Sequence, residues 1–148
     1  MKNILAIDFG LKRVGLALGD EEKRYVYGYK TIEINNLNDL LKKILEIVKE
    51  KEVFKIIIGY PKGLKGEETE RGRLVKKFKE RLEKTIDKEI ILFDERYTTD
   101  LAKRIIFPKD FKKSGLKKKE SMKREINLLS AILLLESYLK GEEKERED

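Results

Sequence analysis

Two carboxylates are the residues of this chain best placed to do chemistry. Asp8 ends an apolar run at residues 4–7, and Glu95 follows a second apolar run at residues 90–93, after Asp94. In open α/β sheets, ligands bind where buried strands end in loops, so both side chains occupy candidate ligand positions. Carboxylate oxygens in such places are typical ligands of Mg²⁺ or Mn²⁺. The two positions therefore predict metal-assisted phosphate chemistry.

The absence of two residue types narrows the chemistry further. The chain contains no histidine and no cysteine. A Ser-His-Asp triad, a cysteine nucleophile, a histidine general base and a zinc site of nitrogen or sulfur ligands are all excluded. Catalysis must then rest on carboxylates, hydroxyls, lysine or arginine.

The positive charge of the chain is concentrated in one segment. The net charge is +7, and residues 101–125 carry ten Lys/Arg against three Asp/Glu, a surplus of +7. The remaining 25 basic and 25 acidic residues cancel. Such a local surplus indicates a surface that binds a polyanion, and beside a carboxylate metal site it favours nucleic acid.

Length and composition predict one cytoplasmic domain. A chain of 148 residues is long enough to bury a core. We expect a folded unit at residues 1–140 and a charged, disordered tail at residues 141–148. No signal-peptide pattern precedes the first strand, and the longest apolar stretch, residues 126–135, is too short to span a membrane.

The hydrophobic periodicity predicts three strands followed by alternating helices and strands. Strands are expected at residues 4–8, 14–19, 25–34, 56–58 and 89–93. In the second strand, bulky Val14, Leu16 and Leu18 alternate with small residues. Helical spacing begins after Asn36, a plausible N-cap, and recurs at residues 67–84. We expect a short helix after Thr98 or Thr99, a loop at residues 108–120 and a last helix from Ser121.

This order predicts an α/β fold with a mixed five-stranded sheet flanked by helices. Short turns join the first three strands into an antiparallel meander, whereas the later strands are reached by parallel crossovers. The order of the strands within the sheet is not determined by these patterns.

Several motifs along residues 2–140 together resemble one known family. They are Ala6-Ile7-Asp8-Phe9-Gly10-x4-Gly15-Leu16-Ala17, Ile58-Gly59-x-Pro61, Gly66 with Arg71-Gly72 and Phe78, Asp94-Glu95-Arg96-x-Thr98-Thr99 and Leu135-Glu136-Ser137-Tyr138-Leu139. This set is similar to the YqgF family, whose members are Holliday-junction-resolvase-like and are described as pre-16S rRNA nucleases. The resemblance implies a ribonuclease-H-like fold and a cytoplasmic role in maturing the 5′ end of 16S rRNA.

The resemblance also implies three acidic positions around a divalent metal. Two of them match Asp8 and Glu95, and the third falls on Asn127, where the family usually has Asp. An Asn side chain offers a neutral carbonyl oxygen but no charge. Glu125 lies about 200° around the helix from this position and cannot replace it. The expected catalytic residues and ligands of Mg²⁺ or Mn²⁺ are thus Asp8, Glu95 and Asn127.

The expected contacts to nucleic acid are basic residues near the same sheet edge and in the basic segment. They are Lys12, Arg13, Arg96, Lys112, Lys113, Lys117, Lys118, Lys119, Lys123 and Arg124. The leading hypothesis is a metal-dependent endonuclease on structured RNA, with RNA favoured over DNA and no membrane partner. The alternatives are a resolvase of four-way DNA junctions and a non-catalytic RNA-binding or transcription-associated module, which Asn127 favours. Monomer and homodimer both remain open.

Overall fold

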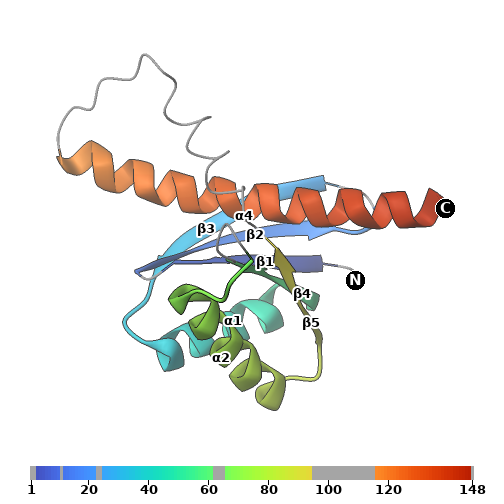
Figure 1. Cartoon of the computed structure of the whole chain (residues 1–148), viewed down its shortest axis with the longest axis horizontal. Coiled ribbons are helices and arrows are strands. Elements are labelled where there is room, and N and C mark those ends of the chain that lie inside the picture. The colour runs from blue at the N-terminus through green and yellow to red at the C-terminus, as the bar shows by residue number, and fades with distance from the viewer. Residues whose placement is uncertain (1–2, 11, 23–24, 62–65, 95–115, 148) are drawn as a thin grey trace.

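Eight helices and strands make up the part of the chain that the structure describes. The structure is a computed structural model that describes residues 3–10, 12–22, 25–61, 66–94 and 116–147, with the backbone alone for 116–122 and 142–147. Figure 1 shows the elements in the order β1 (Asn3–Phe9), β2 (Arg13–Asp20), β3 (Tyr25–Glu33), α1 (Leu37–Glu50), β4 (Val53–Tyr60), α2 (Glu70–Thr85), β5 (Glu89–Asp94) and α4 (Leu116–Glu147). The five predicted strands are all present.

The strands form one mixed sheet in the order β3-β2-β1-β4-β5. β1 pairs antiparallel with β2 and parallel with β4, while β2 pairs antiparallel with β3 and β4 pairs parallel with β5. The predicted meander and parallel crossovers are confirmed. β1 is the central strand, so a side chain at its end is surrounded by neighbouring strands on both sides.

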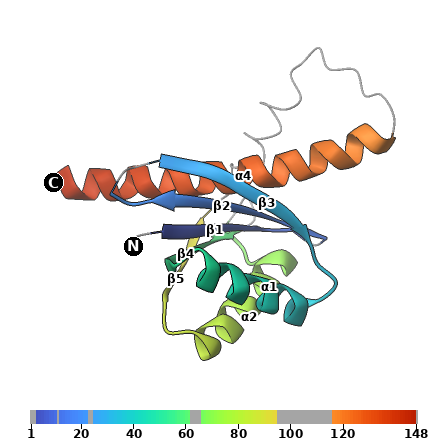
Figure 2. The same ribbon diagram turned by 180° about the vertical axis from the view of Figure 1, so that it is seen from behind.

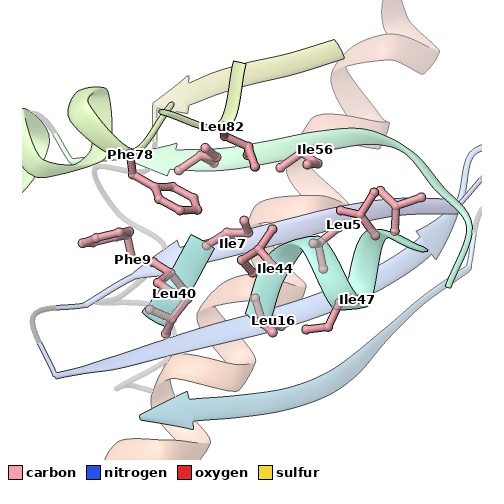
Figure 3. Packing of buried hydrophobic residues seen from close by; sticks show 14 of the residues in the cluster. Leu5, Ile7, Phe9, Leu16, Leu40, Ile44, Ile47, Ile56, Phe78 and Leu82 are labelled. Carbon is pink, nitrogen blue, oxygen red and sulfur yellow. The ribbon is translucent and has the colours of Figure 1, made fainter. Parts of the chain in front are cut away.

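One face of the sheet packs against α1 and α2. Figure 3 shows Leu5, Ile7 and Phe9 of β1 meeting Ile44 of α1 and Phe78 of α2. The Phe9 and Phe78 ring centroids lie 5.9 Å apart in a tilted arrangement. Each of these side chains is almost fully buried, and burial of an apolar side chain of this size stabilises the fold by about 1.5–3 kcal/mol.

The opposite face of the sheet carries α4. Figures 1 and 2 show this long helix lying across the strands, on the side away from α1 and α2. Its buried residues Ala131, Leu134 and Leu135 pack with Ile4 and Ala6 of β1. Because side chains alternate across a strand, the bulky residues of β2 face α1 and its small residues face α4.

Two predicted helix boundaries need correction. The second helix begins at Glu70 rather than residue 67, because the Thr69 side chain caps it by accepting a hydrogen bond from Gly72 N at 2.9 Å. The last helix begins at Leu116, within the predicted loop, since residues 116–120 are all strong helix formers. The predicted helix after Thr98 or Thr99 lies outside the described residues.

The carboxyl end of α4 also differs from expectation. A disordered tail was predicted from Gly141, whereas the helix continues through Glu147. Residues 142–147 are Glu, Lys and Arg, whose high helix propensities offset the cost of one internal glycine of about 1 kcal/mol. By contrast, the predicted cap of α1 is confirmed, since Asn36 Oδ1 accepts a hydrogen bond from Asp39 N at 2.8 Å.

A buried lysine joins α4 to the sheet near the carboxyl-terminal half of that helix. Lys55 of β4 is only 7% exposed and donates a hydrogen bond to Tyr138 Oη of α4 at 3.1 Å. Its ammonium group also lies 3.5 Å from Glu21 and 3.8 Å from Glu89. A buried charge is costly unless it is paired, and these partners compensate Lys55 from three different segments.

No helix in the described part of the chain has the length and apolar character needed to cross a membrane.

Replacing Lys55 by Met tests this connection. The Lys55→Met variant keeps most of the side-chain volume but leaves Glu21 and the Tyr138 hydroxyl without their cation. We expect a loss of about 1–3 kcal/mol in the free energy of unfolding. Breaking an ion pair with both partners buried would cost more, but one partner of Lys55, Glu89, is exposed to water. Urea unfolding monitored by circular dichroism measures it.

The matched control is Lys79→Met. Lys79 forms an i,i+4 ion pair with Glu83 at 2.7 Å on the surface of α2. Such pairs contribute about 0.3–0.5 kcal/mol. Equal losses in the two variants would contradict a special contribution from Lys55.

Candidate metal and nucleic-acid site

Asp8 lies at the carboxyl end of the central strand, on the face that carries α4. Leu5, Ile7 and Phe9 contact the α1 and α2 layer, whereas Ile4 and Ala6 pack under α4. Strand alternation therefore places Asp8 on the α4 side. The residue is only 4% exposed. A carboxylate this far from water must be compensated by hydrogen bonds or positive charge, and this is the environment in which a metal ligand is expected.

Gly15 of β2 stands directly opposite Asp8 in the antiparallel pair. Opposed residues in such a pair lie about 5 Å apart and project to the same face. A methyl group on Gly15 would overlap the backbone carbonyl oxygen of Asn127 and would lie 3.1 Å from Leu128 N. The backbone of α4 thus rests against β2 at the residue that faces Asp8.

Thr31 of β3, the next strand of the sheet, also contacts α4. It is the register partner of Gly15, and its hydroxyl donates a hydrogen bond of 2.8 Å to the Arg124 carbonyl oxygen. Arg124 lies one helical turn before Asn127, so two consecutive turns of α4 dock on neighbouring strands. We call Asp8, Gly15 and Thr31 the docking row.

Asn127 belongs to the face of α4 that meets the sheet. It precedes Ala131, Leu134, Leu135 and Tyr138 by four, seven, eight and eleven positions, the spacing of a single helix face. All four of these residues are buried, and Asn127 itself is partly buried. Asp8 and Asn127 therefore both adjoin Gly15, as expected if they belong to one site.

The second predicted carboxylate, Glu95, lies outside the described residues. β5 ends at Asp94, immediately before it. Ile91 and Phe93 pack on the α4 side of the sheet, whereas Ile90 and Leu92 pack on the α1 and α2 side. No cluster of three acidic residues able to hold a metal occurs within the described residues. The joint ligand set of Asp8, Glu95 and Asn127 stays a prediction.

The predicted basic contacts fall into two groups. Arg13 and Arg124 come together around Glu33 of β3, at 4.0 Å and 2.5 Å from its Oε1 atom. Lys12 and Lys123 are exposed. Arg96, Lys112 and Lys113 lie outside the described residues, and only the backbone of α4 is described at Lys117, Lys118 and Lys119.

The sequence placed Gly15 in the family motif without predicting its contact with α4, and it did not mark Thr31 or Glu33 as site residues. The small residues that alternate with Val14, Leu16 and Leu18 in β2 carried the signal for Gly15, because such a face admits a helix backbone. Thr31 and Glu33 are polar, lie two positions apart and share one face of β3. Such alternation of polar residues usually indicates a strand face exposed to solvent. Their partner is 93 or 91 positions away in the chain, so only the fold reveals the contact.

The Glu33 carboxylate is held in its charged form by its surroundings. The Arg124 guanidinium, which hydrogen-bonds it, lowers the pKa of Glu33, and the charges of Arg13 and Lys43 act in the same direction. Lys43 of α1 also donates a hydrogen bond of 3.1 Å to the Glu33 backbone carbonyl. Cations from β2, α1 and α4 thus converge on one residue at the end of β3.

The donor set around Asp8 fits a hard divalent cation. The site combines the buried carboxylate of Asp8 with Asn127, a partly buried amide residue whose backbone adjoins Gly15, the strand partner of Asp8. Oxygen donors of this kind suit Mg²⁺ or Mn²⁺ rather than a metal that requires nitrogen or sulfur ligands. The fit supports the metal prediction, and Glu95 is the remaining candidate donor.

Comparison with known proteins decides the family. A family model described as "RuvX: Holliday junction resolvase" matches residues 2–141. The chain belongs to this family. Its RuvX-family relatives include a protein of Sulfurihydrogenibium sp. (strain YO3AOP1), 38% identical over 144 residues, which are 94% of this chain and 90% of the relative. A relative from Bacillus subtilis (strain 168) is 32% identical over 138 residues, with 92% and 96% of the two chains covered. Both are named "Putative pre-16S rRNA nuclease".

Solved structures show that the RuvX-family chain shares its fold with resolvases. The fowlpox virus resolvase in complex with Holliday junction DNA matches with a TM-score of 0.57 at 11% identity, covering 94% of this chain and 97% of that one. Thermus thermophilus RuvC matches with a TM-score of 0.54 at 8% identity, covering 89% and 92%. These likenesses confirm the predicted ribonuclease-H-like fold.

The contact between α4 and β2 is tested by Gly15→Ala. The added methyl group meets backbone atoms, which cannot rotate away, so α4 must shift from the docking row. We expect a loss of about 1–3 kcal/mol in the free energy of unfolding. The control is Gly141→Ala in α4 itself. Nothing lies within 4 Å of the methyl group that this substitution adds. That variant should gain about 0.5–1 kcal/mol from helix propensity. Unchanged stability of Gly15→Ala in thermal unfolding would contradict the close approach.

Proposed function

We propose that this protein is a metal-dependent endonuclease of the cytoplasm that acts on structured RNA and matures the 5′ end of pre-16S rRNA. The observation that carries the proposal is the docking row. The carboxylate of Asp8 is buried opposite Gly15, and the backbone of Asn127 rests on the same glycine, with Arg124 one turn earlier in α4. The names of the RuvX-family relatives support RNA as the substrate.

The metal would be held by Asp8, Glu95 and Asn127. Glu95 directly follows Asp94, the last residue of β5, and Phe93 of that strand packs on the α4 side of the sheet. When bound, Mg²⁺ or Mn²⁺ lowers the pKa of water and stabilises the leaving oxygen of a phosphodiester. Asp8 would hold the ion from the central strand, and Asn127 would contribute a neutral oxygen from α4.

The basic residues would bind and orient the RNA backbone. Arg13 and Arg124 both lie within 4.0 Å of Glu33, two residues along β3 from Thr31 of the docking row, and Lys12 and Lys123 are exposed beside them in sequence. The remaining contacts that we propose are Arg96, Lys112, Lys113, Lys117, Lys118 and Lys119. Phosphate contacts position a nucleic acid without reading its sequence, so substrate choice must depend on the shape of the RNA.

A four-way DNA junction is the second candidate substrate. The description of the matching family model favours it, and so does the likeness of the fold to the fowlpox virus resolvase. The two substrates require the same metal chemistry. A non-catalytic RNA-binding module is the third candidate, which the neutral Asn127 favours.

A cleavage assay with paired substrates tests the proposed activity. The protein should cut a labelled precursor rRNA fragment in the presence of Mg²⁺ or Mn²⁺ and should cut a four-way DNA junction of equal length much more slowly. Asp8→Asn should lower the cleavage rate at least 100-fold, an order of magnitude typical for loss of a principal catalytic group, while circular dichroism shows an unchanged fold. Faster cleavage of the junction would make the protein a DNA resolvase, and cleavage without metal would contradict the mechanism.

The role of Asn127 is tested by Asn127→Asp. An added carboxylate beside Asp8 repels it without metal and attracts a divalent ion when one is present. The melting temperature should therefore fall in EDTA and rise more steeply with Mg²⁺ or Mn²⁺ than that of the parent. Cleavage should be at least as fast as in the parent.

The matched control is Asn38→Asp on α1. Asn38 accepts a hydrogen bond from Arg81 at 2.9 Å on the opposite face of the sheet, so the same added charge should give no metal response. If Asn127→Asp responds to metal no more than Asn38→Asp, Asn127 is not a ligand.

A further inference from the structure

Two tyrosines of β3 are exposed on the face of the sheet that carries α1 and α2. Tyr25 and Tyr27 are 46% and 45% exposed, and no other large hydrophobic side chain of the described residues is exposed to this extent. Their ring centroids lie 6.0 Å apart and their planes differ by 18°, so the rings stack. β3 is an edge strand, and Leu18, the register partner of Tyr27, packs in the α1 and α2 layer. The two rings thus form an aromatic surface that is open to water at the edge of the sheet.

A β-bulge brings a lysine to the same face. Lys30 pairs with Leu16 of β2, whereas Gly28 already pairs with the next residue of that strand. Tyr29 is therefore an extra residue in β3, and Lys30 projects with the tyrosines because Leu16 belongs to the α1 and α2 layer. Without the bulge, strand alternation would direct Lys30 to the α4 side.

Two cations adjoin the third tyrosine of this strand. Nζ of Lys30 lies 5.1 Å from the centroid of the Tyr29 ring, and Nζ of Lys51, the residue that caps the end of α1, lies 5.3 Å from it. Both distances are typical of a cation–π interaction. Lys30 is exposed and Lys51 is partly buried, and none of the ion pairs between described residues involves either of them. Positive charge without a paired carboxylate in this part of the chain therefore borders the aromatic surface.

An acidic residue marks the other end of the aromatic surface. Asp20 is the register partner of Tyr25, and its Oδ1 atom accepts a hydrogen bond of 2.8 Å from Glu22 N just after β2. The charge beside the tyrosines thus changes from negative at Tyr25 to positive at Tyr29. An anionic chain that lies across the rings is expected to place its phosphates at the lysine end.

We infer that this surface binds single-stranded nucleic acid, with bases stacked on Tyr25 and Tyr27 and a phosphate beside Lys30 and Lys51. Aromatic rings next to cations are the features by which proteins hold single strands without reading their sequence. The net charge of +7 favours a polyanion over a second copy of the chain, which would carry the same charge. The inference goes beyond the proposed function, because this surface lies on the opposite face from Asp8 and needs no metal.

The stacking is tested by a variant that combines Tyr25→Leu and Tyr27→Leu. Leucine keeps an apolar side chain on the strand but removes the ring. We expect the dissociation constant for a labelled single-stranded RNA of about 12 nucleotides to rise at least about fivefold, the lower end of the range for the loss of one stacked base. The combined Tyr25→Phe and Tyr27→Phe variant keeps both rings and should bind like the parent. An abasic strand of equal length should not distinguish the leucine variant from the parent. Fluorescence anisotropy in EDTA, which withholds the divalent metal, measures all of these affinities.

The phosphate contact is tested by Lys30→Gln and Lys51→Gln. Each substitution should lower the slope of log affinity against log salt for the single strand by about 0.7, the contribution of one phosphate contact. Lys88→Gln is the matched control, because Lys88 is exposed next to β5, at the opposite edge of the sheet. Its salt slope should equal that of the parent. These variants keep both tyrosines, so they test the surface independently of any change in folding that the leucines cause.

The outcomes separate this inference from the proposed function. If the leucine variant binds the single strand as tightly as the parent, or if the parent binds no single strand, the inference is wrong, while the cleavage assay with Asp8→Asn still decides the nuclease proposal. Equal salt slopes for Lys30→Gln, Lys51→Gln and Lys88→Gln would also overturn it. If the parent is a dimer in size-exclusion chromatography and the leucine variant is a monomer with unchanged affinity for RNA, the tyrosines belong to an interface between copies.

Discussion

The close approach of α4 to β2 at Gly15 is the constraint on which the candidate site depends. A helix backbone can rest on a sheet only where the strand beneath it has no side chain, and Gly15 provides that gap directly opposite Asp8. The Thr31 hydroxyl fixes the rotation and height of the helix by bonding the Arg124 carbonyl one turn earlier. Together the two contacts place residues 124–127 over β2 and β3, next to the end of β1 where Asp8 is buried.

The two faces of the sheet divide stability and chemistry between them. The α1 and α2 face buries large apolar side chains such as Phe9 and Phe78, and its packing makes the sheet rigid (Figure 3). The α4 face has small residues, a buried lysine paired by Glu21 and Tyr138, and the carboxylate of Asp8. Polar groups under a helix are costly unless they are compensated, so the apolar contacts of Leu134 and Leu135 with β1 must offset that cost on this face. A site needs such a rigid support if its ligands are to keep their positions.

Periodicity predicted the five strands, both early helices and the Asn36 cap, because each of these depends on neighbours in sequence. The alternation of large and small residues in β2 even indicated that its two faces differ. What the sequence could not supply was the partner of the small face, or the start of α4 inside a lysine-rich stretch. Asp8 and Asn127 were predicted as site residues, and the fold brings both to Gly15. Glu33 was missed because its cations come from elements up to 91 positions away, and no local pattern marks such a contact.

Electrostatic repulsion gives a physical reason for two features of the α4 face, the neutral Asn127 near Asp8 and the position of Glu33 between two arginines. Clustered carboxylates repel one another in the absence of metal, and each further acid near Asp8 raises that cost in a poorly solvated place. A neutral Asn127 lowers the repulsion, at the expense of weaker attraction for the ion. Around Glu33 the charges have the opposite sign. Arg13 and Arg124 would repel each other, and the carboxylate near both lowers that repulsion. In the proposed function, a divalent cation at Asp8 would bring the positive charge that compensates this buried carboxylate, and the neutral Asn127 keeps the cost of the empty site low.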